Sequence, residues 1–194
     1  MTTRQASRQR KTAETTIEVE LLVDGSGTAS ASTGIPFFDH MLEQLGKHAG
    51  FDLKIVATGD LEVDTHHTIE DVGIVVGGCL AEALGDKVGV RRFASNLVPL
   101  DEALVQVALD LSGRPFIAYD VDPISEWIGT FDPQLAEEFW RAFAFAAGIT
   151  LHVRSLEGRN GHHVIEASFK AVARALRDAV RIEGTGIPST KGSL

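Results

Sequence analysis

One motif occurs twice in this chain, and its repetition limits the folds that the chain can adopt. The first copy runs from His66 to Glu70 (HHTIE), and the second runs from His162 to Glu166 (HHVIE). Each copy begins a run in which apolar residues recur every three or four positions, which is typical of one buried face of a helix. The sequence therefore predicts two matched helices, each with a His-His-x-x-Glu motif at its start.

The segments around the two motifs also repeat. In the first half we expect strands at 15–23 and 28–32, joined as a hairpin by the turn 24–27, then a helix at 37–48, a strand at 51–58 and the first motif helix. In the second half we expect strands at 103–111 and 116–121, again returning through a turn, then a helix at 133–147, a strand at 149–155 and the second motif helix. Residues 1–11 are polar and basic, and we expect them to form a loose arm.

The order strand, strand, helix, strand, helix thus occurs twice, which is stronger evidence than any single motif. Two helices in each half must cover one face of a sheet. We predict an α+β fold made of two duplicated halves, each a mixed four-stranded sheet with two helices on one face. The halves are residues 1–94 and 95–194, and the second half ends in a candidate phosphate-binding tail.

The composition excludes several classes of protein. The chain has 194 residues, 44% hydrophobic and 23% charged, which is enough for a sizeable core. No apolar run reaches the roughly 18 residues that a membrane span needs, and the N-terminus lacks the apolar centre of a secretory signal. The single cysteine, Cys79, fits a reducing compartment, and the net charge of −9 argues against general nucleic-acid binding. We expect a cytoplasmic protein with no membrane or nucleic-acid partner.

The spacing inside each motif is typical of metal binding. His66 and Glu70 are four residues apart, so on a helix they share a face and can hold one ion together. His67 points about 100° away and would reach a different ion. Because the second motif repeats this geometry, we expect two metal ions, each drawing on both copies.

The repeat also indicates further ligands. His40 lies ten residues before Gly50 and Glu138 lies ten residues before Gly148, both in the middle of a predicted helix. Imidazole and carboxylate ligands without a thiolate suit Mn, Fe, Co, Ni or Zn, and spacing does not choose among these metals. A symmetric assignment gives two ions, one held by His40, His67, His162 and Glu166 and the other by His66, Glu70, Glu138 and His163.

Basic residues supply candidates for binding an anion. Lys170 follows Glu166 by four residues and shares its helix face. The tail Ser189-Thr190-Lys191-Gly192 offers hydroxyls, a cation and a flexible backbone, which suit phosphate, although a frayed polar terminus is the alternative. The full set of basic candidates is Arg92, Arg114, Lys170 and Lys191.

Five stretches carry a resemblance to a known family. They are STGIPFFDHML at 32–42, DTHHTIED at 64–71, LDLSGRP at 109–115, GRNGHHVIEASFKA at 158–171 and PSTKG at 188–192. Together they resemble the imidazoleglycerol-phosphate dehydratases of histidine biosynthesis. The resemblance covers nearly the whole chain, from about Arg10 to Leu194.

The resemblance implies dehydration of imidazoleglycerol phosphate to imidazole-acetol phosphate and water, through an imidazolate bound by two metal ions. It also implies two Mn(II) ions per subunit and a homo-oligomer of twenty-four subunits with active sites at subunit interfaces. Many members of the family have His where this chain has Glu138, and a carboxylate oxygen still suits Mn(II).

The resemblance also implies roles for particular residues. The family's metal positions match His40, His66, His67, Glu70, His162, His163 and Glu166. Its substrate positions match Glu14, Arg92, Arg114, Lys170, Ser189 and Lys191, and we add Thr190 from the same tail. As catalytic residues we expect Glu14, the candidate acid/base, together with His66, Glu70, His162 and Glu166.

Two alternatives come from other classes of protein. A two-metal phosphoesterase would use the same ions to activate water. A non-catalytic shell or storage protein would use the ligands for metal-dependent assembly. The basic candidates beside the ligands argue against pure storage.

Overall fold

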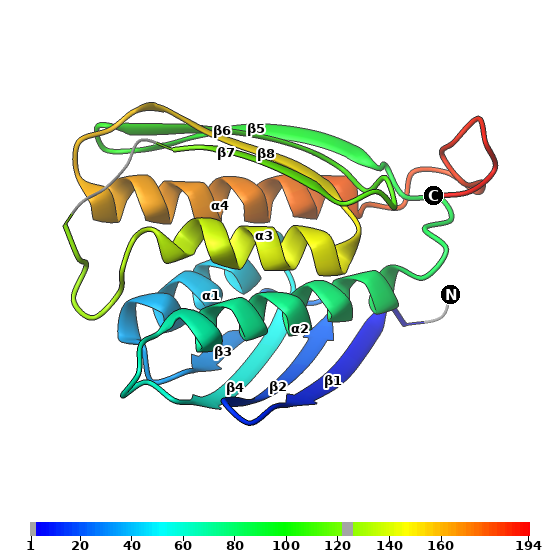
Figure 1. Ribbon diagram of the computed structural model, residues 1–194. Coiled ribbons are helices and arrows are strands. Elements are labelled where there is room, and N and C mark those ends of the chain that lie inside the picture. The colour runs from blue at the N-terminus through cyan, green and yellow to red at the C-terminus, as the bar shows by residue number, and fades with distance from the viewer. Residues whose placement is uncertain (1–2, 122–125) are drawn as a thin grey trace.

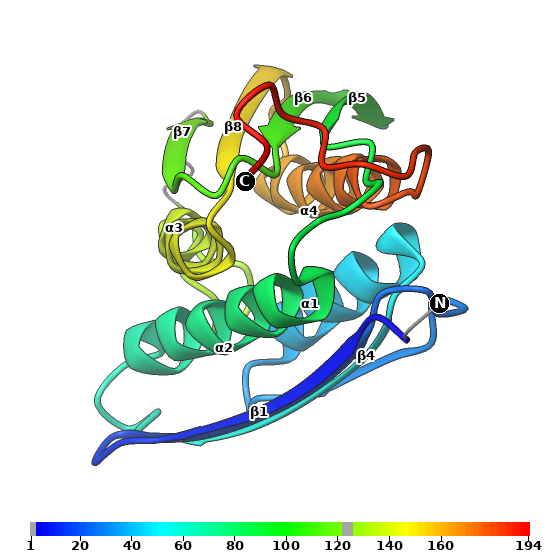
Figure 2. The ribbon, with the colours of Figure 1, turned by 90° about the vertical axis from the view of Figure 1, so that its right-hand side faces the viewer.

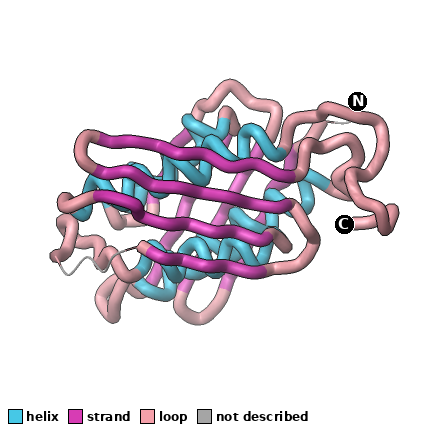
Figure 3. Tube along the Cα trace, turned by 90° about the horizontal axis from the view of Figure 1, so that it is seen from above, coloured by secondary structure: helices cyan, strands magenta, loops and turns pink. Residues whose placement is uncertain are grey.

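The computed structural model describes residues 3–121 and 126–194. The chain is built in four layers, with one sheet on each outer side and two layers of helices between them (Figures 1 and 2). Each half supplies one sheet and the pair of helices that covers it, and Figure 3 looks down on the second sheet with helices beneath it. In the part of the chain that the structure describes, no helix is long and apolar enough to cross a membrane.

The two halves have the same order of elements. The first half contains β1 (Gln5–Lys11), β2 (Thr15–Leu22), β3 (Ala29–Ser32), α1 (Pro36–Ala49), β4 (Asp52–Gly59) and α2 (His66–Leu84). The second half contains β5 (Phe93–Leu100), β6 (Ala103–Asp110), β7 (Phe116–Asp120), α3 (Leu135–Ala147), β8 (Thr150–Glu157) and α4 (Gly161–Ala179). The duplicated α+β fold with two mixed four-stranded sheets is confirmed. The predicted boundary after residue 94 falls inside β5.

The strand orders are β1-β2-β4-β3 and β5-β6-β8-β7, with the last pair of each sheet parallel and the others antiparallel. Both predicted hairpins were therefore wrong, because β3 pairs with β4 and β7 pairs with β8. A parallel pair needs a crossover connection, and α1 and α3 supply it. The turns at 24–27 and 112–115 lead into β3 and β7, and the crossovers begin after those two strands.

The expected loose arm at residues 1–11 was also wrong, because β1 occupies most of it. Ala6 is the one buried residue of β1, so the strand shows no alternation of apolar and polar residues. β5, which no pattern predicted, likewise buries only Val98. Both are edge strands whose backbones pair with β2 and β6, and in β5 the half-buried Ala94 and Leu100 also pack against the core.

The helix layers form the centre of the core. Near Gly73 and Gly77 of α2 the backbone of α3 approaches closely, so a Cβ atom added at Gly77 would lie 2.4 Å from the carbonyl oxygen of Phe143. On the other side, α3 contributes fully buried aromatic rings such as those of Phe139 and Trp140. This close packing fixes α2 against α3 and thereby sets the position of the motif at the start of α2.

Candidate active site

Both His-His motifs lie at the same end of the molecule. His66 is the first residue of α2 and His162 is the second residue of α4, and the two helices begin on the same side in Figure 1. Side chains two residues earlier fix both helix starts. Asp64 Oδ1 accepts the backbone N–H of His66 at 2.7 Å, and Asn160 Oδ1 accepts that of His162 at 3.0 Å.

Glu166 is the centre of one group of candidate ligands. It is only 9% exposed, and its Oε2 lies 3.0 Å from Nε2 of His162 and 3.7 Å from Nε2 of His40. His40 reaches this group because α1 packs against α4. The structure thus brings together three of the four residues predicted for one ion. The fourth, His67, has its contacts elsewhere.

Lys170 explains how a carboxylate persists at this buried position. Its Nζ lies 2.7 Å from Oε1 of Glu166. Burial opposes ionisation of Glu166, but the hydrogen bond and charge of Lys170, together with the contacts of His162 and His40, outweigh it and lower the pKa of the carboxyl. The sequence placed both side chains on one helix face, and that prediction is confirmed.

His67 and His163, the second histidines of the two motifs, each contact carboxylates. Nδ1 of His67 lies 3.0 Å from Oδ2 of Asp60 and 3.8 Å from Oε2 of Glu14. Nδ1 of His163 lies 2.8 Å from Oε2 of Glu102. The hydrogen bonds that Asp60 and Glu102 accept raise the pKa of His67 and His163 respectively.

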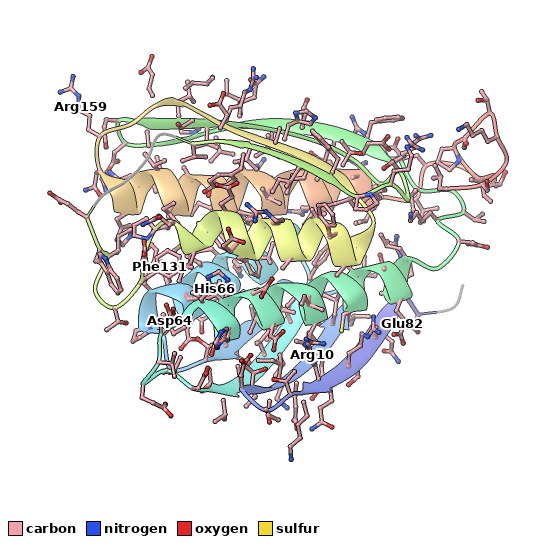
Figure 4. The ribbon with its side chains drawn as sticks, viewed as in Figure 1. Arg10, Asp64, His66, Glu82, Phe131 and Arg159 are labelled. Atoms are coloured by element: carbon pink, nitrogen blue, oxygen red, sulfur yellow. The ribbon has the colours of Figure 1, made fainter. Side chains whose placement is uncertain are left out.

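The remaining candidate ligands lie around the start of α2. His66 and Glu138 line the same pocket of about 380 Å³, together with Asp64 and Trp127. Figure 4 places His66 close to Asp64 at this end of the molecule. Glu138 also pairs with Arg141 at 3.0 Å, and Glu70 is exposed on α2.

The described residues do not bring together all four ligands predicted for either metal ion. Among residues 3–121 and 126–194, no group of three or more His, Cys, Asp or Glu side chains is arranged to hold a metal ion. The group around Glu166 contains three of the four ligands predicted for one ion, and His66 and Glu138 are two of the four predicted for the other.

The candidate phosphate-binding residues form a second group around Asp110. Arg92 Nε donates to Oδ1 of Asp110 at 2.7 Å, and Arg92 Nη1 donates to the carbonyl oxygen of Pro188 at 2.8 Å. Arg114 lies 4.0 Å from Asp110 and is largely exposed. The start of the tail 188–192 is therefore held by Arg92, and Ser189, Thr190 and Lys191 are exposed or half-buried.

The two groups lie at opposite ends of α4. Glu166 is in the second turn of that helix, whereas the tail follows its C-terminal end and lies at the other side of Figure 1. Glu166 lies 13 residues (179 − 166) before the last residue of α4, which is about 20 Å at ~1.5 Å per residue. A small substrate cannot contact both groups in a single chain.

Sequence reasoning missed Asp60 and Glu102, the two carboxylates that contact the second histidines. Glu102 immediately precedes β6, as Glu14 immediately precedes β2. Alignment of the two halves would have placed it beside the second motif. Asp60 follows β4, and its counterpart after β8 is Gly158, so the repeat gave no signal for Asp60.

The fold and the paired motifs define a class of duplicated, four-layered α+β proteins with a His-His-x-x-Glu motif at the start of two matched helices. The family model for imidazoleglycerol-phosphate dehydratase matches residues 33–176. The chain belongs to the imidazoleglycerol-phosphate dehydratase family.

Comparison with individual relatives supports the same family assignment. The chain is 58% identical to the imidazoleglycerol-phosphate dehydratase of Acidothermus cellulolyticus, over 98% of this chain and 93% of that protein. It is 56% identical to that of Caldanaerobacter subterraneus subsp. tengcongensis, over 98% and 100% of the two chains. The prediction that the chain is an enzyme of the dehydratase class is confirmed.

Solved structures show the same fold. The chain matches the imidazoleglycerol-phosphate dehydratase of Staphylococcus aureus subsp. aureus N315 with a TM-score of 0.82 and 38% identity, over 90% of this chain and 97% of the other. It matches the Pyrococcus furiosus protein, solved in complex with (S)-C348, with a TM-score of 0.84 and 38% identity, over 96% and 100% of the two chains.

Proposed function

We propose that this chain converts imidazoleglycerol phosphate to imidazole-acetol phosphate and water, as a lyase of histidine biosynthesis, at sites built from more than one subunit. The observation that carries the proposal is the group of His40, His162, Glu166 and Lys170, which places two imidazoles and a cation around one buried carboxylate. Family membership gives the reaction. The geometry of the site supports the roles proposed for individual residues.

The donor set fits two Mn(II) ions per subunit. It consists of imidazole nitrogens and carboxylate oxygens, and none of the predicted ligands is a thiolate. Bound Mn(II) would act as a Lewis acid on the imidazole ring of the substrate. The residues that would hold it are His40, His67, His162 and Glu166 for one ion and His66, Glu70, Glu138 and His163 for the other.

Glu14 is the proposed acid/base. It lies in the turn between β1 and β2, where Thr12 Oγ1 accepts its backbone N–H at 3.1 Å. Its side chain is 54% exposed and lies 3.8 Å from His67 Nδ1, so it stands beside a candidate ligand without being held by it. Removing a proton from carbon and returning one to the departing hydroxyl are tasks for a single carboxyl acting in turn.

The basic residues would bind and orient the phosphate end. Arg92 and Arg114 present guanidinium groups near the tail, and a guanidinium can grip phosphate through two parallel hydrogen bonds. Lys170 would contribute from the motif end of a neighbouring chain. Fixing the phosphate keeps the reacting carbons in place, and the full proposed set is Arg92, Arg114, Lys170, Ser189, Thr190 and Lys191.

The separation of the two groups along α4 supports a homo-oligomer with shared sites. We propose an assembly of twenty-four subunits in the cytoplasm, with no membrane or nucleic-acid partner. The incomplete ligand groups of the single chain support the same arrangement.

The test is turnover of imidazoleglycerol phosphate by metal-stripped protein, before and after addition of Mn(II), with particle mass followed in parallel. We expect activity and a large particle to appear together. A large particle without product would contradict the dehydratase assignment, and product from a single subunit would contradict shared sites. Inorganic phosphate is measured in the same reaction, because its release would identify a phosphoesterase.

A further inference from the structure

The second histidine of each motif donates from Nδ1 to a carboxylate, and the two carboxylates come from different places in the two halves. Asp60 follows the last residue of β4, whereas Glu102 precedes the first residue of β6. Asp60 and Glu102 do not correspond to each other in the repeat, yet they contact the same atom, Nδ1, of two histidines that do correspond.

The reason for the difference lies in the turn after β8. Gly158 stands there at the place that Asp60 occupies after β4. A Cβ atom at Gly158 would lie 2.3 Å from Cγ2 of Val164, so a side chain has no room at that position. The carboxylate for His163 has to come from another loop, and Glu102 supplies it.

Glu102 also differs in its contacts from Glu14, its counterpart in the first half. Glu102 Oε2 lies 2.8 Å from His163, and its Oε1 accepts the backbone N–H groups of Asn160 at 2.8 Å and Arg159 at 3.2 Å. These contacts, the His163 hydrogen bond first, lower the pKa of Glu102 to about 2. Glu14 is only near His67. The two halves therefore use this position differently, for a proposed acid/base in the first half and for a hydrogen-bond acceptor in the second.

A carboxylate has only acceptor lone pairs, so in both pairs Nδ1 carries the proton. The hydrogen bond at one ring nitrogen decides which nitrogen remains free for a metal ion. We propose that Asp60 and Glu102 are positioning residues that keep the protons of His67 and His163 on Nδ1 and so present Nε2 of each ring to Mn(II). This inference rests on the proposed metal-dependent function.

We expect Asp60 and Glu102 to respond differently when each is replaced by its amide. Both oxygens of Asp60 face Nδ1 of His67, at 3.0 and 3.3 Å. In Asp60→Asn the amide oxygen can therefore take over the hydrogen bond. In Glu102→Gln the backbone N–H groups of Arg159 and Asn160 retain the amide oxygen, which leaves the NH₂ group facing Nδ1 of His163. That donor favours the wrong tautomer, with the proton on Nε2.

The experiment is titration of metal-stripped protein with Mn(II), with free Mn(II) counted by its electron paramagnetic resonance signal. We expect Asp60→Ala, Glu102→Ala and Glu102→Gln each to weaken Mn(II) binding by about 10- to 100-fold. Asp60→Asn should bind within about threefold of the unchanged protein. The matched control is Glu20→Gln, an exposed carboxylate that pairs with Lys54 at 3.0 Å on the outer face of the first sheet.

Circular dichroism and particle mass establish that each variant has folded. Unchanged Mn(II) affinity in both alanine variants would overturn the inference, and so would Glu102→Gln binding as tightly as the unchanged protein. Uptake of no Mn(II) by the unchanged protein would overturn the proposed metal-dependent function, and this inference with it.

Discussion

Arg92 donates a hydrogen bond from Nη1 to the carbonyl oxygen of Pro188, 2.8 Å away and 96 residues further along the chain. The same guanidinium donates to both carboxylate oxygens of Asp110, at 2.7 and 3.1 Å. Arg92 therefore joins the tail to β6, and it fixes the place from which Ser189 and Lys191 start.

Replacement of Arg92 by alanine should release the tail. We expect trypsin to cleave after Lys191 faster than in the unchanged protein, and KM to rise by about tenfold or more, because hydrogen bonds to a charged group contribute about 1.5–3 kcal/mol. Intact mass after limited proteolysis measures the first effect. Arg181→Ala is the control, since Arg181 only approaches Glu183 at 3.9 Å. Equal cleavage in both variants would contradict the role of Arg92 in holding the tail.

Glu14→Gln removes the proposed acid/base without changing its shape. Turnover should fall by about 10²–10⁴-fold, the usual contribution of a positioned proton-transfer group. The Mn(II) content should stay the same, because Glu14 is not a proposed ligand. Glu18→Gln, on the same hairpin and hydrogen-bonded to Gln9 at 2.8 Å, controls for loss of a negative charge. Full activity of Glu14→Gln would remove Glu14 from the mechanism.

Glu138→His tests whether this residue reaches a metal ion. An imidazole in place of a hard oxygen ligand should shift the preference of one site from Mn(II) toward Zn(II) or Co(II). Competition titrations with metal-stripped protein measure the ratio of affinities. Glu137→His is a closely matched control, because Glu137 also pairs with Arg141, at 3.1 Å. The same ratio in both variants would place residue 138 outside the metal centre.

Gly77→Ala should destabilise the contact between α2 and α3. The added methyl group would lie 2.4 Å from a backbone oxygen of Phe143, which cannot move without shifting α3, and overpacking of this kind costs about 1–3 kcal/mol. Gly78→Ala, one residue along, meets only the flexible end of Arg8 and should gain up to about 1 kcal/mol of helix propensity. Urea unfolding of metal-free protein compares the two, and equal stabilities would contradict close packing at Gly77.

The thiol of Cys79 should make the protein less stable as the pH rises in alkaline solution. Burial raises the pKa of its thiol to about 11, above the ~8.5 of a free cysteine. Between these values the unfolded chain loses the thiol proton while the folded chain keeps it, so the free energy of unfolding falls as pH rises. The difference in slope between the unchanged protein and Cys79→Ala should approach about 1.4 kcal/mol per pH unit within this window. Parallel curves from pH 8 to 11 would contradict the raised pKa.

The helices and the site residues on them followed from the sequence, because apolar periodicity is dense in α2 and α4 and each motif lies at a helix start. The edge strands β1 and β5 could not be predicted, since each fully buries only one side chain and neither shows a clear alternation of apolar and polar residue types. The parallel pairing of β3 with β4 was missed for a related reason. A turn such as 24–27 looks the same whether the two strands that it joins become neighbours or leave a place between them, which β4 fills here.

Within the candidate site, the sequence identified the side chains that share a helix face, such as Glu166 and Lys170. It missed Asp60 and Glu102, which loops bring to the helix starts; the repeat contained a signal for Glu102, the counterpart of Glu14, and none for Asp60. It also gave no measure of the distance between the motif end and the tail, which depends on the direction of α4 relative to the second sheet.

The layered arrangement bears on how such a chain arose. Each half presents a layer of helices that is apolar on the side facing the other half, and a half standing alone would leave that layer in water. The simplest cover for it is a second copy of the same half, related by a two-fold axis, as in an isologous dimer. Fusion of two such copies turns their association into an intramolecular event that no longer depends on concentration. Each copy is then free to acquire its own substitutions, as Asp60 and its counterpart Gly158 illustrate.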